Sequence, residues 1–348
     1  MIERLVRKHQ RETALRVSLL SGIASGIVSL LSTGALTNFV SALLNMGIGF
    51  FIGFMAPLII QFLADTIRTN PIARRMPGVV SFVLFVLFTT AVVTALTLGV
   101  MVGLSFVIEA RLPDATALRY SIRTALTVAG SLAVLLNVYL TLQQYLGRAF
   151  FRDLFLGRYS SPREELKAVA FVDLVGSTGL AESMGPGRFF DLLNDYLGTV
   201  EMIAHYCGGT IYKYLGDGVI IVWGMPAAAH RPLECLVMLR DEMIERGDHF
   251  ERRFGVRPRF TAGLHLGPLL VGEIGRERKE LGYWGDTMNT AQRVQDACKR
   301  AGSPILVSEE YLAAVRTLPA PLSGLSLHRI EGVTLKGKTT HMVLHAVR

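Results

Sequence analysis

The hydrophobic and polar positions divide the chain into two different halves. No charged residue occurs between Val17 and Ala64, between Pro77 and Ile108, or between Thr124 and Gly147. A membrane-spanning helix needs about 20 consecutive apolar residues. The first segment is long enough for two such helices and each of the others for one. The pattern therefore predicts an all-α bundle of four transmembrane helices in residues 1–149.

The charges beside these segments predict their orientation. Basic residues are concentrated in Met1–Arg16, in Asp65–Arg75 and after Arg148, and basic flanks are typical of the cytoplasmic side. We therefore expect a multi-pass protein of the inner membrane with both termini in the cytoplasm. No Asp, Glu, Lys, Arg or His lies inside a predicted span, which argues against an ion pump or proton relay.

In the second half, short apolar runs alternate with amphipathic stretches, as is typical of a folded α+β domain. Short runs rich in Val, Ile and Phe, bounded by Gly, predict strands, and longer amphipathic stretches predict helices. We expect strands at 169–175, 210–213, 219–223, 259–265, 269–271, 281–284, 304–307 and 341–346, and helices at 178–183, 187–205, 229–250 and 286–300. This order predicts a βαββαβ, ferredoxin-like core. Residues 150–164 form a short juxtamembrane linker, and the domain occupies residues 165–348.

Composition and charge help to decide whether the chain binds nucleic acid or a membrane. The 348 residues are 51% hydrophobic and 18% charged, with a net charge of +8. A basic balance can indicate nucleic-acid binding. Here the basic residues flank apolar segments, and no basic stretch is interleaved with aromatics, so we expect a membrane and no nucleic acid. The three cysteines lack CxxC spacing and suit a reducing compartment.

Two aspartates are the strongest candidates for chemistry. Asp173 closes the apolar run that begins at Ala168, and Asp217 lies in the turn before the run Val219–Trp223. A buried carboxylate is costly unless something pairs with it. Carboxylate oxygens suit Mg²⁺ bound to a nucleotide's phosphates. Taken singly, Asp173 is better explained as a strand-end aspartate that caps the following turn, and Asp217 as an ordinary hairpin residue.

A second motif follows later in the chain, in the sequence Tyr283-Trp284-Gly285-Asp286-Thr287-Met288-Asn289-Thr290-Ala291-Gln292-Arg293. Asp286 is placed to cap a helix. Asn289 and Arg293 are four residues apart and so share one helix face. Near the end, Lys336-Gly337-Lys338 offers a point charge for phosphate, although a basic hairpin turn explains it nearly as well.

Together these motifs resemble the class III adenylyl/guanylyl cyclases, from about Glu165 to the C-terminus. Phe171-Val172-Asp173-Leu174-Val175-Gly176-Ser177-Thr178 is similar to the first strand of that family, and Lys213-Tyr214-Leu215-Gly216-Asp217 to its hairpin. The resemblance implies a cyclase homology domain that converts ATP to 3′,5′-cyclic AMP and pyrophosphate. It also implies a homodimer with its sites at the interface.

The resemblance assigns a role to each motif residue. It implies two Mg²⁺ or Mn²⁺ ions per site, held at Asp173, Leu174 and Asp217. It also implies that Asn289 orients the ribose and that Arg293 stabilises charge in the transition state. Lys336 and Asp286 would lie on the nucleotide side of the site.

The base-selecting positions depart from the family pattern. Lys213 is present, but the position that usually carries its Asp or Thr partner is Gly282, which has no side chain. Lys213 can only donate a hydrogen bond, and adenine N1 is an acceptor. Guanine O6 is an acceptor too. We therefore expect ATP, with a guanylate cyclase or a catalytically silent nucleotide-binding sensor as the alternatives.

Overall fold

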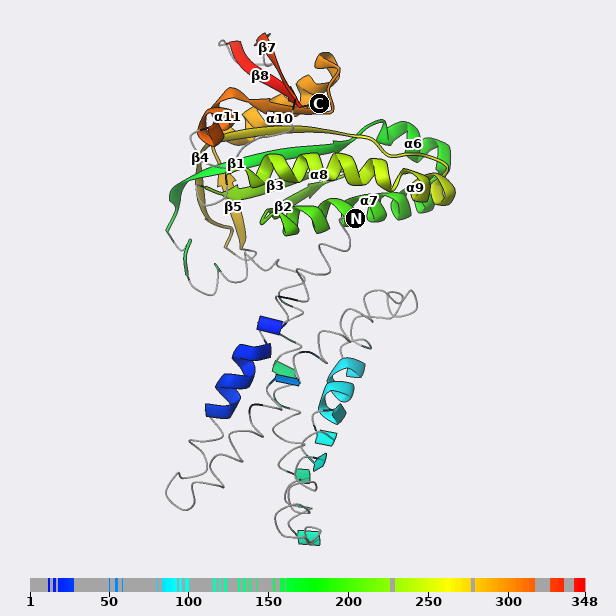
Figure 1. The fold of residues 1–348 in the computed structure, drawn as a ribbon, viewed down its shortest axis with the longest axis vertical. Coiled ribbons are helices and arrows are strands. Elements are labelled where there is room, and N and C mark those ends of the chain that lie inside the picture. The colour runs from blue at the N-terminus through cyan, green and yellow to red at the C-terminus, as the bar shows by residue number, and fades with distance from the viewer. Residues whose placement is uncertain are drawn as a thin grey trace. The chain divides into compact units, whose positions relative to one another are not determined.

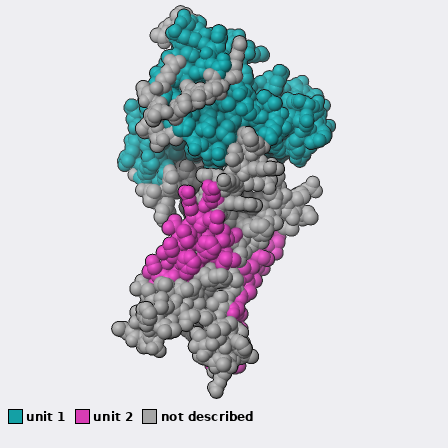
Figure 2. All heavy atoms as spheres, viewed as in Figure 1, with its two compact units in different colours: residues 1–6, 147–348 teal, residues 7–146 magenta. Residues whose placement is uncertain are grey.

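The chain is represented here by a computed structural model (Figure 1). It describes scattered short pieces between residues 12 and 142, and then residues 153, 157–159, 161–225, 229–276, 279–316, 326–334 and 341–347. The chain divides into two compact units, coloured separately in Figure 2. One comprises residues 7–146, and the other comprises residues 1–6 and 147–348. The predicted boundaries at residues 149 and 164 stay predictions.

The unit of residues 7–146 is described only in part. Most of the four predicted spans lie outside the described residues. In the pieces that are described, no helix combines the length and the apolar character needed to cross a membrane. One close approach is visible there: a Cβ added to Gly22 would lie 3.1 Å from the carbonyl oxygen of Phe50 and 3.1 Å from Cβ of Phe54.

The other unit is built on one mixed, eight-stranded sheet. Its strand order is β2-β3-β1-β4-β6-β8-β7, with β5 paired to β4. β4 and β6 are parallel and the other pairs are antiparallel. The strands are β1 (Arg163–Leu174), β2 (Thr210–Leu215), β3 (Gly218–Gly224), β4 (Phe260–Ile274), β5 (Glu280–Trp284), β6 (Ile305–Ser308), β7 (Leu327–Thr334) and β8 (His341–Val347).

Six described helices pack with this sheet. They are α6 (Ser177–Met184), α7 (Pro186–Tyr206), α8 (Arg231–Glu245), α9 (Gly247–Phe254), α10 (Asp286–Ala301) and α11 (Glu309–Arg316). The predicted α+β domain is therefore confirmed in its coarse form, as a mixed sheet with helices.

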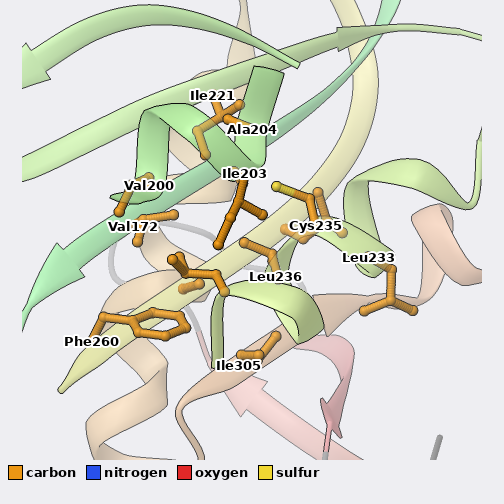
Figure 3. Packing of buried hydrophobic residues seen from close by; sticks show 14 of the residues in the cluster. Val172, Val200, Ile203, Ala204, Ile221, Leu233, Cys235, Leu236, Phe260 and Ile305 are labelled. Atoms are coloured by element: carbon orange, nitrogen blue, oxygen red, sulfur yellow. The ribbon is translucent and has the colours of Figure 1, made fainter. Parts of the chain in front are cut away.

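The two faces of the sheet have different cores. Successive residues of a strand point to opposite faces, so Ala168, Ala170, Val172 and Leu174 of β1 join the larger core beneath α7, α8, α9 and α11. Figure 3 shows part of this core. The side chains labelled there are Val172, Val200, Ile203, Ala204, Ile221, Leu233, Cys235, Leu236, Phe260 and Ile305.

The opposite face packs against α10. Val169 of β1, Ile220 of β3 and Leu269 of β4 form a smaller cluster with Ala291 of α10. A third cluster joins Val294, further along α10, to β6 and β8. Odd-numbered residues of β1 face this side, which puts Asp173 on the α10 side of the sheet.

Two predicted elements are wrong in their extent. The single helix expected at 229–250 is two helices, because the chain turns at Arg246 before Gly247. The side chain of Arg246 there bonds to Thr199 and to Asp195 of α7. Glycine also weakens a helix interior, which favours the break at this position.

The strand expected to end at His265 instead continues to Ile274. Pro268 has no N–H to contribute, yet β4 stays paired with β1 from Phe260 to Val271. The Pro268 carbonyl accepts a hydrogen bond from the Thr287 hydroxyl at 2.7 Å. The long pairing with β1 therefore keeps β4 extended across Gly267 and Pro268. Two further elements, α11 and β7, were not predicted at all.

Candidate active site

The two aspartates meet where β1 ends beside the turn between β2 and β3. Val172 of β1 pairs with Val219 of β3, so the turn at Gly216–Asp217 lies next to Asp173. A Cβ added to Gly218 would lie 2.9 Å from Oδ1 of Asp173. The site therefore needs glycine at position 218, because any side chain there would displace the carboxylate.

The ionised form of the Asp173 carboxyl is disfavoured by its surroundings. Its pKa is raised from 3.8 to about 6, first by burial, then by the charge of Asp217, and last by that of Asp296. Like charges and partial burial both penalise the ionised form. A cation placed between Asp173 and Asp217 would relieve both penalties.

This donor set fits a hard divalent cation. Mg²⁺ prefers oxygen ligands and usually keeps waters or substrate phosphates in its shell rather than a full protein cage. Among the described residues, no group of three or more His, Cys, Asp and Glu side chains is arranged to hold a metal. The remaining ligands would therefore be a backbone carbonyl, such as that of Leu174, together with water and phosphate oxygens.

A large cavity opens beside Asp173. It has a volume of about 990 Å³ and reaches from the end of β1 to α8, the start of β4 and the second half of α10. Four basic side chains line it, which suits an anionic ligand such as a polyphosphate. They are Arg240, Arg257, Arg259 and Lys299. The sequence pattern did not single out these residues, because they come from α8, from the connection between α9 and β4, and from α10.

The motif helix α10 is formed as predicted, with one correction at its start. The N-cap is Gly285 and not Asp286, and no side chain caps the helix. Asp286 is the first helical residue, and its Oδ2 accepts a hydrogen bond from the Thr290 hydroxyl at 3.3 Å. Asn289 is exposed and Arg293 is half-buried.

Asn289 and Arg293 do not line the cavity beside Asp173 of the same chain. From α10, that cavity is lined by Gln295, Asp296, Cys298 and Lys299. The two halves of the predicted site are thus not gathered into this one cavity. Lys336 lies outside the described residues.

The base-selecting positions lie on strands that approach each other. Lys213 of β2 is exposed and Gly282 of β5 is buried. The neighbouring rings of Tyr212 and Tyr283 meet edge to face, with centroids 4.7 Å apart. Although β2 and β5 are not hydrogen-bonded neighbours, this contact places the two strands side by side at Tyr212 and Tyr283.

A buried tyrosine beneath the aspartates was not predicted. Tyr196 of α7 is fully buried, and its hydroxyl has no hydrogen-bond partner in the part of the chain that the structure describes. Burial, followed by the charges of Asp173 and Asp217, raises the pKa of Tyr196. Its position on a buried helix face is the usual one for a core aromatic, so no sequence pattern marked it as functional.

We expect Tyr196→Phe to leave the stability of this domain unchanged or to raise it by about 1 kcal/mol, since it removes an unsatisfied buried hydroxyl. The matched control is Tyr311→Phe. The Tyr311 hydroxyl accepts from the Leu233 amide and donates to the Ala229 carbonyl, so its loss should cost about 1–3 kcal/mol. Urea unfolding followed by tryptophan fluorescence measures both. Equal destabilisation by the two substitutions would contradict the prediction.

The comparison with known proteins identifies the domain. Residues 159–347 match the family described as the adenylate and guanylate cyclase catalytic domain. Because this match covers more than half of the 348 residues, the chain belongs to that family. It therefore carries a nucleotide cyclase catalytic domain. Such domains act on ATP or GTP, generally use Mg²⁺ or Mn²⁺, and typically dimerise.

Individual relatives include both kinds of cyclase. Adenylate cyclase 2 of Rhizobium meliloti is 33% identical over 216 residues, which cover 60% of this chain and 56% of that protein. Retinal guanylyl cyclase 2 of Rattus norvegicus is 30% identical over 183 residues, covering 51% of this chain and 16% of that one. The chain thus spans little more than half of the first relative and far less of the second.

A solved structure shows the same fold. A bacterial light-regulated adenylyl cyclase superposes with a TM-score of 0.55 at 15% identity, covering 64% of each chain. At this identity the likeness concerns the fold alone.

Proposed function

We propose that the protein is a membrane-anchored adenylate cyclase, which converts ATP to 3′,5′-cyclic AMP and pyrophosphate. The observation that carries the proposal is the juxtaposition of Asp173 and Asp217 at the end of β1, inside a domain of the cyclase family. Two close carboxylates with hard oxygen donors are suited to the metal ions of phosphoryl transfer.

In the reaction the ribose 3′-hydroxyl loses its proton to solvent and its oxygen forms a bond to the α-phosphorus. The bond from that phosphorus to the bridging oxygen breaks, and pyrophosphate leaves. Two Mg²⁺ or Mn²⁺ ions, when bound, would supply Lewis-acid stabilisation of these oxygens. Asp173, Asp217 and the Leu174 carbonyl would hold the ions. The remaining work in this class of chemistry is positioning and charge stabilisation.

The other predicted residues would supply that positioning. Asn289 would orient the ribose, and Arg293 would stabilise charge on the α-phosphate as it develops. Lys336 would bind the terminal phosphates, and Asp286 would lie at the nucleotide side of α10. The basic cavity beside Asp173 would favour entry of the polyphosphate.

The proposed enzyme is a homodimer with two sites at the subunit interface. In each site one subunit would supply Asp173 and Asp217, and the other would supply Asn289 and Arg293. The structure supports this arrangement in one respect, since α10 lines the cavity beside its own Asp173 with different residues.

Membrane anchoring belongs to the same proposal. Its support is the distribution of charge: no charged residue occurs in 17–64, 77–108 or 124–147, and basic residues flank these segments. Four spans would place both termini and the catalytic domain in the cytoplasm, where ATP is available.

We expect membranes containing the protein to form cyclic AMP from ATP in the presence of Mn²⁺ or Mg²⁺, and little cyclic GMP from GTP. Chromatography of the products from the two nucleotides, supplied separately, measures this. Cyclic GMP as the main product would replace the adenylate cyclase by a guanylate cyclase. Nucleotide binding by a dimer without any cyclic product would indicate a silent sensor, an alternative that Gly282 favours.

A further inference from the structure

Three sulfur atoms meet in the large core, where α7 ends beside α8. The Cys207 thiol, at the C-cap of α7, donates a hydrogen bond to the Met238 sulfur, with Sγ and Sδ 3.7 Å apart. Cys235 precedes Met238 by three residues on α8, and its thiol is hydrogen-bonded to Cys207. Both cysteines are free thiols, and Figure 3 shows Cys235 among the residues of this core. We call Cys207, Cys235 and Met238 the sulfur cluster.

The spacing of the sulfur cluster fits a single metal ion. Two sulfur ligands that each lie about 2.3 Å from one tetrahedral ion are about 3.8 Å apart. The separation of the Cys207 and Met238 sulfurs is close to this value. Cys235 and Met238 are three residues apart on one helix and so share a side of it, which places both beside Cys207. The three side chains therefore need little movement to bind the same ion.

The donor atoms decide which kind of ion this would be. Thiolate and thioether sulfurs are soft ligands, which select ions such as Cu(I) and leave Mg²⁺ to oxygen donors. Three protein donors also fall short of the four that structural Zn²⁺ sites use. The sulfur cluster thus differs in its chemistry from the pair Asp173 and Asp217, whose oxygens suit Mg²⁺.

The sulfur cluster is buried but lies close to the surface. Cys207 and Cys235 are 2% and 1% exposed, whereas Met238 is only partly buried, and Gly208, next to Cys207, is exposed. The contact with Cys207, followed by burial, raises the pKa of the Cys235 thiol. A metal ion would replace the protons of both thiols, which pass to solvent, so the affinity should rise with pH.

We propose that Cys207, Cys235 and Met238 form a Cu(I) site that joins the end of α7 to α8. This site is separate from the proposed cyclase reaction. Cys207 is followed by Gly208 and Gly209 and then by β2, which leads to the turn that carries Asp217. A bound ion would hold the connection between α7 and β2 against α8 and would stabilise the folded domain.

Titration of the reduced, metal-free, full-length protein with Cu(I), against the coloured Cu(I) chelator bicinchoninate, tests the site. We expect one ion per chain and a higher temperature of thermal unfolding in its presence. Cys207→Ala and Cys235→Ala should each weaken binding roughly 100-fold or more, and Met238→Leu roughly 10-fold. Cys298→Ala is the matched control and should bind like the wild type, because the buried Cys298 thiol donates instead to the Ala262 carbonyl at 3.3 Å.

X-ray absorption by the Cu(I) complex of the wild type supplies a measurement that needs no variant. Three sulfur neighbours at about 2.3 Å, the usual metal–thiolate distance, would support the site. Nitrogen or oxygen neighbours in their place would overturn it. Unweakened binding by Cys207→Ala or Cys235→Ala would overturn it too, as would a loss of binding in Cys298→Ala alone. None of these readouts uses cyclic AMP, so the result is independent of the proposed function.

Discussion

Asp173→Asn is expected to lower cyclic AMP formation roughly 10³-fold or more, which corresponds to about 4 kcal/mol of transition-state stabilisation. The amide keeps the size of the side chain but removes the charge that would hold a divalent ion. Asp173 lies beside Asp217 and beside a cavity lined by basic residues. The other carboxylates of β1, Glu164 and Glu165, lie at the opposite end of the strand. Turnover by the purified variant, compared with the wild type at saturating Mn²⁺, measures the effect.

The same substitution should stabilise the metal-free protein at neutral pH. The folded-state pKa of Asp173 is about 6, above its ordinary value of 3.8. Between these values the folded protein holds a proton that the unfolded chain has released. The free energy of unfolding therefore falls as pH rises through this window and stays lower above it. Since the carboxyl is only half-buried, solvent screening reduces the effect to about 1 kcal/mol.

Urea unfolding in the presence of a chelator, at about pH 4.5 and about pH 7.5, tests the sign of this effect. Asp173→Asn should be the more stable protein only at the higher pH. Millimolar Mg²⁺ should then stabilise the wild type and not the variant. Asp191→Asn, on the exposed side of α7, is the matched control and should change neither turnover nor the Mg²⁺ effect. Undiminished turnover by Asp173→Asn would contradict the assignment of this carboxylate.

Local patterns in the sequence predicted the parts of the site that lie at a strand end, in a glycine-flanked turn or on one helix face. Asp173 ends an apolar run and Asp217 occupies a glycine-flanked turn, and the register of β1 with β3 brings these two places together. Asn289 and Arg293 share α10 because their spacing is that of one helix face. These inferences needed only strand alternation, turn chemistry and helix periodicity.

The features that depend on tertiary packing were not predictable in this way. The contact between Gly282 and Trp284 depends on a side-chain rotamer, and a glycine in an apolar run gives no sign of what covers it. The basic cavity joins α8, β4 and α10, which are distant in sequence. The strand expected to end at His265 continues to Ile274, because its pairing with β1 extends as far as Val271.

A mixed dimer of Asp173→Asn and Arg293→Ala subunits is expected to recover activity that neither variant has alone. If each site combines the aspartates of one subunit with the α10 residues of the other, both lesions fall into one site and the second site is intact. Heterodimers purified through two different affinity tags should then reach about half of the wild-type activity, because one of two symmetric sites works.

A second pairing controls for stabilisation of one damaged subunit by the other. In a heterodimer of Asp173→Asn with Asp217→Asn, every site receives one damaged pair of aspartates, so no activity should return. The contrast between the two heterodimers depends only on which subunit supplies which residue. Since α10 lines the cavity beside its own Asp173 with Gln295, Asp296 and Lys299, we expect Arg293 to act on the partner's nucleotide. An inactive heterodimer of Asp173→Asn with Arg293→Ala would instead require all catalytic groups to act within one chain.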